Sequence, residues 1–195
     1  MSEATLRSLV SIVLSSGAIP KIHFRIEGYT VYSECFTRLK TAIRGGEIGL
    51  EIDDARLSKI HAVAGYNPRL DTMYLHSSVL KATAISQESR AAIIHECLHA
   101  VLDMDFVSAL SPYQEEAACA LTTNIYVFHH FGRPFFTANG PATTLTRAIA
   151  RNPGMDITQD GSFLEIYERI ARIYDADDPE YGRRPGLHNG LRKRL

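Results

Sequence analysis

The chain has 195 residues, of which 45% are hydrophobic and 22% are charged, a balance that excludes the disordered and fibrous classes. Its length suits one sizeable hydrophobic core. The formal net charge of −1 gives no reason to expect binding to nucleic acid or attraction to acidic membranes.

The N-terminal part of the chain alternates helical and extended patterns. Leucine and valine recur at helical spacing in residues 3–16, and residues 21–27 alternate apolar with polar side chains as a half-buried strand does. A second helix is predicted over 30–43, with Thr30 as its N-cap and a pair of glycines as its stop. Residues 47–52 are a further candidate strand, followed by a short helical stretch.

The middle of the chain predicts a hairpin followed by two long helices. Residues 61–66 and 71–76 are short alternating runs, and the Asn-Pro pair between them is a turn signal. Ser86 is a suitable N-cap for a helix over 87–104. The next helix, over 112–130, begins after a serine cap, with proline at its first position and a glutamine that closes a capping box.

The C-terminal part of the chain is less regular. Helices are expected near 143–151 and over 160–175, whereas residues 176–195 form a basic tail without periodicity that we expect to be flexible. We therefore predict a single domain over 1–175. Its class is α+β, with a small antiparallel sheet packed against helices.

The cysteines and the apolar runs indicate the compartment. Cys35, Cys97 and Cys119 are too few, and odd in number, for a disulfide framework, so they indicate reduced thiols. Cys97 and Cys119 are interpreted as small core residues. No apolar run reaches the ~18 residues that a membrane-spanning helix needs. We therefore expect a cytoplasmic protein, with secretion as an effector as the alternative.

Residues 95–99, His-Glu-Cys-Leu-His, are the motif that predicts chemistry. On an α-helix, positions i and i+4 lie about 40° apart around the axis, so His95 and His99 project from one face and can share a cation. Zinc accepts imidazole nitrogens and, at catalytic sites, keeps one position for water. Glu96 is placed to take a proton from that water, so the motif predicts zinc-dependent hydrolysis with Glu96 as the general base.

The residues around the motif, AAIIHECLHAVL, are apolar on nearly every side and predict a buried helix. Two imidazoles and a carboxylate buried without partners would cost several kcal/mol, so they need a metal ion or a complete hydrogen-bond network. The alternative is a structural helix whose polar residues are exposed or bonded to one another.

The third metal ligand has two possible sources. A glycine turn brings the last ligand back in some His-Glu-x-x-His sites, but this chain has Leu102 at the glycine position and Asp105 at the ligand position. A continuous helix would carry Asp105 to the far side. The other source is Glu115 or Glu116 in the next helix, where small residues allow close packing. Asp103 is a candidate to hold an imidazole by its second nitrogen, or a solvated helix-end acid.

HECLH followed by EEAACAL resembles the gluzincin metallopeptidases, in particular the ImmA/IrrE-like and minigluzincin types, over residues 62–128. The resemblance implies a zincin-like fold, in which a small antiparallel sheet packs on an active-site helix and a second, ligand-bearing helix. It implies one zinc ion held by His95, His99 and Glu116, with Glu115 as the reserve, and a peptide or protein substrate. The hairpin before the motif resembles the edge strand on which such enzymes dock their substrate.

Two other functions remain open. A zincin-derived domain can bind zinc or a protein partner without turnover. The other is a carboxylate-bridged di-iron protein, which needs two Glu-x-x-His motifs, and Glu96-x-x-His99 is the single such motif in the chain. The candidate donors to a developing oxyanion are Tyr113, Tyr126, His129, His130 and His188.

Overall fold

The structure is a computed structural model that describes residues 3–80 and 85–177. These residues form α-helices, short 3-10 turns and short strands. In chain order they are α1 (Glu3–Leu14), η1 (Ile19–Lys21), β1 (Phe24–Ile26), β2 (Tyr29–Val31), α2 (Ser33–Gly45), β3 (Gly49–Ile52), α3 (Asp54–Lys59), β4 (Ala64–Asn67), β5 (Thr72–Leu75), η2 (Ser77–Leu80), α4 (Gln87–Met104), α5 (Pro112–Phe131), α6 (Pro141–Arg151) and α7 (Gly161–Asp177). The α+β class is therefore confirmed.

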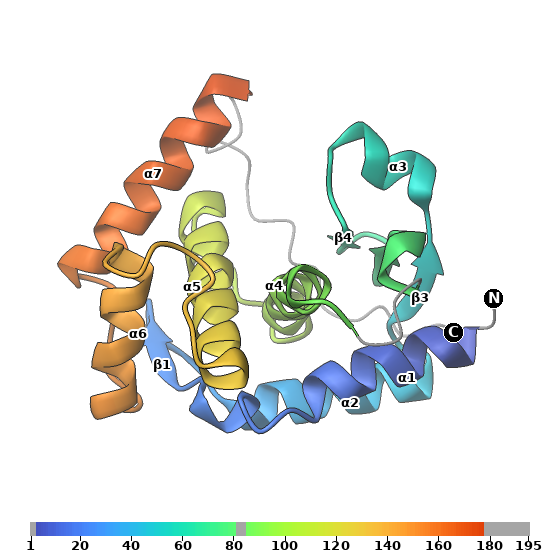
Figure 1. Ribbon diagram of the computed structural model, residues 1–195, viewed down its shortest axis with the longest axis horizontal. Helices are drawn as coiled ribbons and strands as arrows, with labels where there is room; N and C mark the ends of the chain where they lie inside the picture. Colours follow the sequence, from blue (N-terminus) through green and yellow to red (C-terminus); the bar gives the residue numbers. More distant parts are fainter. Residues whose placement is uncertain (1–2, 81–84, 178–195) are drawn as a thin grey trace.

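Helix α4 lies at the centre of the molecule and is seen almost end-on in Figure 1. Helices α1 and α2 run beneath it, the β3–β5 sheet lies on one side, and α5 packs along the other, backed by α6 and α7. Because α4 is surrounded, its buried residues lie on every side, as the apolar pattern around the motif predicts.

The N-terminal region differs from its prediction at Thr30. This residue pairs with Arg25 in the β1–β2 hairpin, and α2 begins three residues later, with Tyr32 in extended conformation as its N-cap. Strand pairing with a neighbour took precedence over the local capping preference of threonine. The predicted stop is correct, since Gly46 has φ +79° and ends α2 in the left-handed conformation that glycine adopts without strain.

The main sheet is mixed, so the predicted antiparallel sheet is wrong for one of its two pairings. The strand order is β3-β5-β4: β4 and β5 form the expected antiparallel hairpin, whereas β3 pairs with β5 in parallel. A parallel neighbour needs a crossover, and α3 together with β4 supplies it. Strand β4 is thus an edge strand, and it packs beside α4.

Both central helices begin as predicted. The side chain of Ser86 accepts a hydrogen bond from the backbone N–H of Ser89 at the start of α4. At the start of α5, Ser111 and Gln114 form a complete capping box around a proline in the first turn. The two helices therefore start at positions set by local chemistry.

Polar side-chain contacts hold the C-terminal helices and the end of α4 in place. Asn124 of α5 donates to the hydroxyl of Thr146 in α6, and its carbonyl oxygen accepts the backbone N–H groups of Phe135 and Phe136. Asp105, just after α4, accepts two hydrogen bonds from Arg38 and one from Tyr29.

Helix α7 continues to Asp177, so the predicted domain boundary at residue 175 falls inside this helix. Residues 178–195, the rest of the predicted basic tail, lie outside the described residues. Within residues 3–80 and 85–177, no helix combines the length and the apolar character that crossing a membrane requires.

Candidate metal centre

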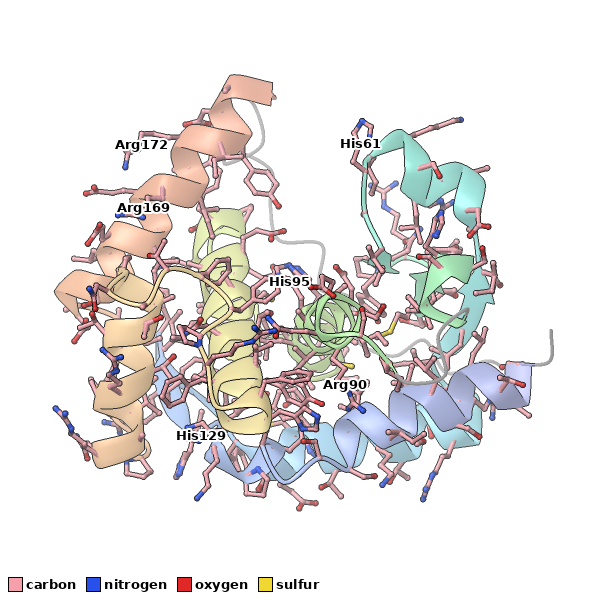
Figure 2. The ribbon with its side chains drawn as sticks, in the orientation of Figure 1. His61, Arg90, His95, His129, Arg169 and Arg172 are labelled. Carbon is pink, nitrogen blue, oxygen red and sulfur yellow. The ribbon has the colours of Figure 1, made fainter. Side chains whose placement is uncertain are left out.

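Helix α4 brings the two predicted histidines together. The Nε2 atoms of His95 and His99 lie 3.3 Å apart, and their ring centroids are separated by 5.0 Å. Two nitrogens bound at about 2.0–2.1 Å to one tetrahedral ion would be about 3.3–3.4 Å apart. The histidine pair therefore has the spacing of two ligands of one metal ion. Figure 2 shows His95 between α4 and α5.

Helix α5 places Glu116 against both nitrogens. Its Oε2 lies 3.3 Å from Nε2 of His95, and its Oε1 lies 3.6 Å from Nε2 of His99. These separations are close to the edge of about 3.4 Å expected between a nitrogen and an oxygen ligand of one zinc ion. The Glu116 side chain is 11% exposed, so its carboxylate is held largely inside the protein. Of the two predicted glutamates, Glu116 is the one that faces both Nε2 atoms.

Glu115 contacts the other side of the same ring. Its Oε1 lies 2.5 Å from Nδ1 of His99, at hydrogen-bond distance. A neutral imidazole that donates its Nδ1–H to this carboxylate presents the Nε2 lone pair on the side of His95 and Glu116. Glu115 thus has the position of an orienting carboxylate, the role for which the sequence had suggested Asp103.

Asp103 has a different partner. It is fully buried, and its Oδ2 accepts a hydrogen bond from the hydroxyl of Tyr66 at 2.8 Å. The alternative prediction of a solvated helix-end acid is therefore wrong. Because Tyr66 belongs to β4, this bond joins the edge strand to α4, one turn beyond His99.

Cys119 is a fully buried core residue, as interpreted from the sequence, and it is also part of the same cluster. Its sulfur and one ring nitrogen each of His95 and His99 all lie within 4.8 Å of one another. Burial raises the pKa of the Cys119 thiol to about 12. The sequence signal for this residue is its position three after Glu116, on the same helix face. Cys97 is likewise a fully buried core residue.

The negative groups around His99 favour a cation at this place. Burial lowers the pKa of His99, but interactions with Cys119, Glu116 and Glu115 outweigh burial and hold that pKa well above its ordinary value. The same field that retains a proton on the imidazole attracts a metal ion, which competes with the proton for Nε2. His95, His99 and Cys119 form a group able to hold a metal ion.

Tyr174 of α7 completes the surroundings of the site, and the sequence did not indicate it. Burial raises the pKa of its hydroxyl, and the charge of Glu116 and a hydrogen bond with the Glu116 side chain raise it further. The charges of His99 and Glu96 also act on the pKa of Tyr174, the first lowering it and the second raising it. Glu96 itself is half-buried on α4, next to His95.

The predicted oxyanion donors lie elsewhere. Tyr113 donates its hydroxyl to Asp175, a contact that joins α5 to α7. Tyr126 lies ten residues after Glu116, which is about 15 Å along the helix, and His129 and His130 lie further still. His188 lies outside the described residues.

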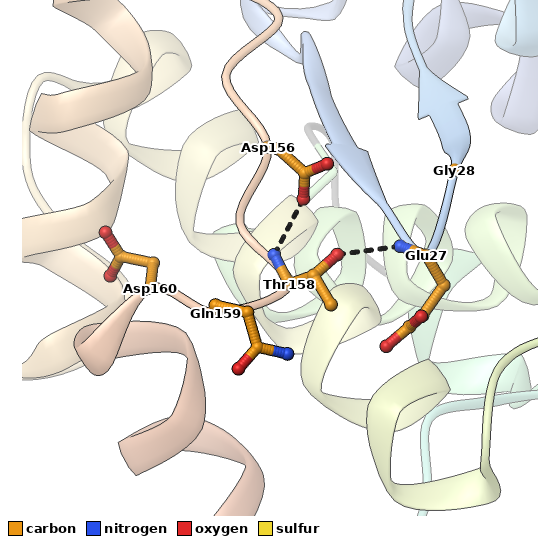
Figure 3. Close-up of a pocket in the computed structure, with 6 residues that line it drawn as sticks. All are labelled: Glu27, Gly28, Asp156, Thr158, Gln159 and Asp160. Carbon is orange, nitrogen blue, oxygen red and sulfur yellow. Dashed lines mark hydrogen bonds between the residues drawn. The ribbon is translucent and has the colours of Figure 1, made fainter.

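A pocket of about 590 Å³ lies away from this cluster, between the β1–β2 turn and the segment before α7 (Figure 3). Its acidic groups are already used locally: Asp156 accepts the backbone N–H of Thr158, and Asp160 accepts that of Ser162. Glu27 accepts a hydrogen bond from the Gln114 side chain. The acidic side chains that line this pocket therefore already have hydrogen-bond partners within the protein.

Comparisons of the chain with protein-family models, with curated proteins and with solved structures find no match. The resemblance to gluzincins stays a prediction, and the function has to be inferred from the side chains at the site.

Proposed function

We propose that the protein is a zinc-dependent hydrolase that cleaves peptide bonds. The observation that carries the proposal is the close approach of three groups. The Nε2 atoms of His95 and His99 lie 3.3 Å apart, and the Glu116 carboxylate lies 3.3 Å from the first through Oε2 and 3.6 Å from the second through Oε1. Two imidazoles and one carboxylate are a known ligand set of catalytic zinc, which leaves one position for water. The three unpaired cysteines fit a reducing compartment such as the cytoplasm.

In this proposal the bound zinc supplies a Lewis acid that activates water and polarises the substrate carbonyl. Glu96 accepts the proton of the attacking water and then delivers it to the leaving amine. Tyr174 donates its hydroxyl to the substrate oxygen as negative charge develops there. Glu115 keeps His99 in the tautomer that offers Nε2 to the metal.

The position of β4 supports a peptide as the substrate. An edge strand has unpaired backbone groups on its outer side, and an extended peptide can add to it as a further strand. Strand β4 packs beside α4, and the bond between Tyr66 and Asp103 fixes the strand to the helix that carries both histidines. A peptide bound along β4 would therefore lie close to the metal ligands.

The test keeps the metal and removes the base. Glu96→Gln should retain about one zinc per chain, because Glu96 is no ligand, and should lose hydrolysis of a proteome-derived peptide library followed by mass spectrometry. His99→Ala should lose zinc as well as hydrolysis. Zinc contents of wild type and His99→Ala that agree would contradict the metal site, and cleavage by Glu96→Gln at the wild-type rate would contradict the mechanism.

A second function, a zinc-binding module without turnover, is favoured by one observation. Cys119 lies close enough to both histidines to act as an additional ligand. Structural zinc sites have four protein ligands and no place for water. A wild-type protein with a full zinc content and no cleavage in the peptide library would support this function.

A further inference from the structure

We infer that Cys119 is a fourth protein ligand of the metal ion, together with His95, His99 and Glu116. This inference rests on the proposed function only in requiring that the cluster binds a metal. It goes beyond that function because a two-histidine, one-glutamate site needs no sulfur ligand.

The distances place the sulfur near a coordination position. A nitrogen at about 2.05 Å and a thiolate sulfur at about 2.3 Å from one tetrahedral zinc ion are about 3.6 Å apart. The Cys119 sulfur lies within 4.8 Å of a ring nitrogen of each histidine, so no more than about 1.2 Å separates either pair from that geometry.

The position on the helix supports the same assignment. Cys119 follows Glu116 by three residues, so both side chains leave α5 on the face that packs against α4. A cysteine that serves only as core is expected among apolar side chains. Cys119 lies in the buried core, but its sulfur also lies within 4.8 Å of a ring nitrogen of both His95 and His99.

The proposed ligands differ in how deeply they are buried. Cys119 is fully buried, whereas the side chains of His95 and Glu116 are 26% and 11% exposed. The sulfur therefore occupies the interior side of the cluster, and solvent and substrate approach from the side of His95. Zinc is a borderline-soft ion that binds thiolate well, and a coordinated thiol gives its proton to solvent on binding.

The fourth ligand has a consequence for chemistry. With four protein ligands in place, water reaches the ion only when the coordination number rises to five or when Cys119 leaves. The thiolate would thus restrain hydrolysis in the resting protein and strengthen metal binding. A fourth ligand on the interior side also explains why the cluster has both the three ligands of a catalytic zinc site and the fourth protein ligand of a structural one.

The experiment replaces zinc by Co²⁺ in the full chain under a non-thiol reductant and records the absorption spectrum. Wild type should show a near-ultraviolet sulfur-to-cobalt charge-transfer band together with visible d–d bands. Cys119→Ala and Cys119→Ser should lose the charge-transfer band and keep the d–d bands. Their zinc affinity, measured by competition with a chromophoric chelator, should fall at least about tenfold.

The matched control is Cys97→Ala. Cys97 is the other fully buried cysteine near the site, on α4 between the two histidines, and its removal should leave both the band and the zinc affinity unchanged. Wild type that binds one cobalt without a sulfur band would overturn the inference and leave the proposed function intact. Failure of wild type and Cys97→Ala to bind either metal would overturn the proposed function itself. The wild-type spectrum decides the question even where a Cys119 variant does not fold.

Discussion

Replacement of Glu115 by glutamine tests how the two neighbouring glutamates divide their roles. Glu115 Oε1 lies 2.5 Å from Nδ1 of His99, whereas Glu116 approaches the Nε2 atoms of both histidines. Glu115→Gln therefore removes the charged acceptor behind a ligand and leaves every proposed ligand in place. Loss of such an outer partner costs about 10- to 100-fold in metal affinity. This corresponds to about 1.4–2.7 kcal/mol of binding free energy.

Glu116→Gln should cost more, because it replaces a ligand oxygen of the carboxylate by a neutral amide. The assay is a zinc titration in competition with a chromophoric chelator, applied to wild type and to both variants. Glu168→Gln, an exposed substitution on α7, is the matched control and should bind zinc as wild type does. Circular dichroism and urea unfolding establish that each variant folds.

The order of the two affinities decides the assignment. Glu115→Gln with wild-type affinity would show that the carboxylate behind His99 does not orient the ring. Abolished binding in Glu115→Gln, with Glu116→Gln close to wild type, would make Glu115 the ligand and refute the geometry on which the proposed function depends.

Three further outcomes are expected. Tyr174→Phe should keep its zinc and lower kcat/KM for library peptides by about 10²–10³-fold, and an unchanged rate would exclude Tyr174 as an oxyanion donor. Asp105→Asn should lower the free energy of unfolding in urea by about 1–3 kcal/mol at pH 7, because it weakens the hydrogen bonds from Arg38 and Tyr29. The loss stays within this range because Arg38 is half exposed and water screens its charge. Burial raises the pKa of Asp105, but these bonds outweigh burial and lower it, so the stabilisation is present above the unfolded pKa of about 3.9 and is lost as the pH falls through the lower folded value. The two proteins should therefore converge in stability below about pH 4, and a gap that persists at acid pH would contradict this cause. Asn124→Ala should destabilise by about 2–4 kcal/mol, because two backbone N–H groups and the Thr146 hydroxyl lose a buried partner, and a smaller loss in urea unfolding would mean that water replaces the amide.

Features governed by interactions within one helical turn were predictable from the sequence. The caps at Ser86 and Ser111 set where α4 and α5 begin, and both begin there. The spacing of His95 and His99 puts both imidazoles on one face of any α-helix, and the 3.3 Å between their nitrogens follows from that spacing and the rotamers. Thr30 shows the limit, because a strand partner elsewhere in the chain overrode its capping preference.

Where Glu115, Glu116, Cys119 and Tyr174 lie relative to the histidines depends on tertiary packing, although the resemblance had already singled out Glu116, with Glu115 in reserve. Successive residues on a helix differ by about 100° in direction, so which glutamate of α5 faces the histidines depends on how α5 is rotated against α4. Cys119 entered the cluster through that same rotation, and Tyr174 through the docking of α7. The parallel pairing of β3 with β5 likewise depends on a crossover that no local pattern specifies. Local sequence patterns thus predicted the two histidines and their helix, whereas the residues that surround them depend on how the other helices pack.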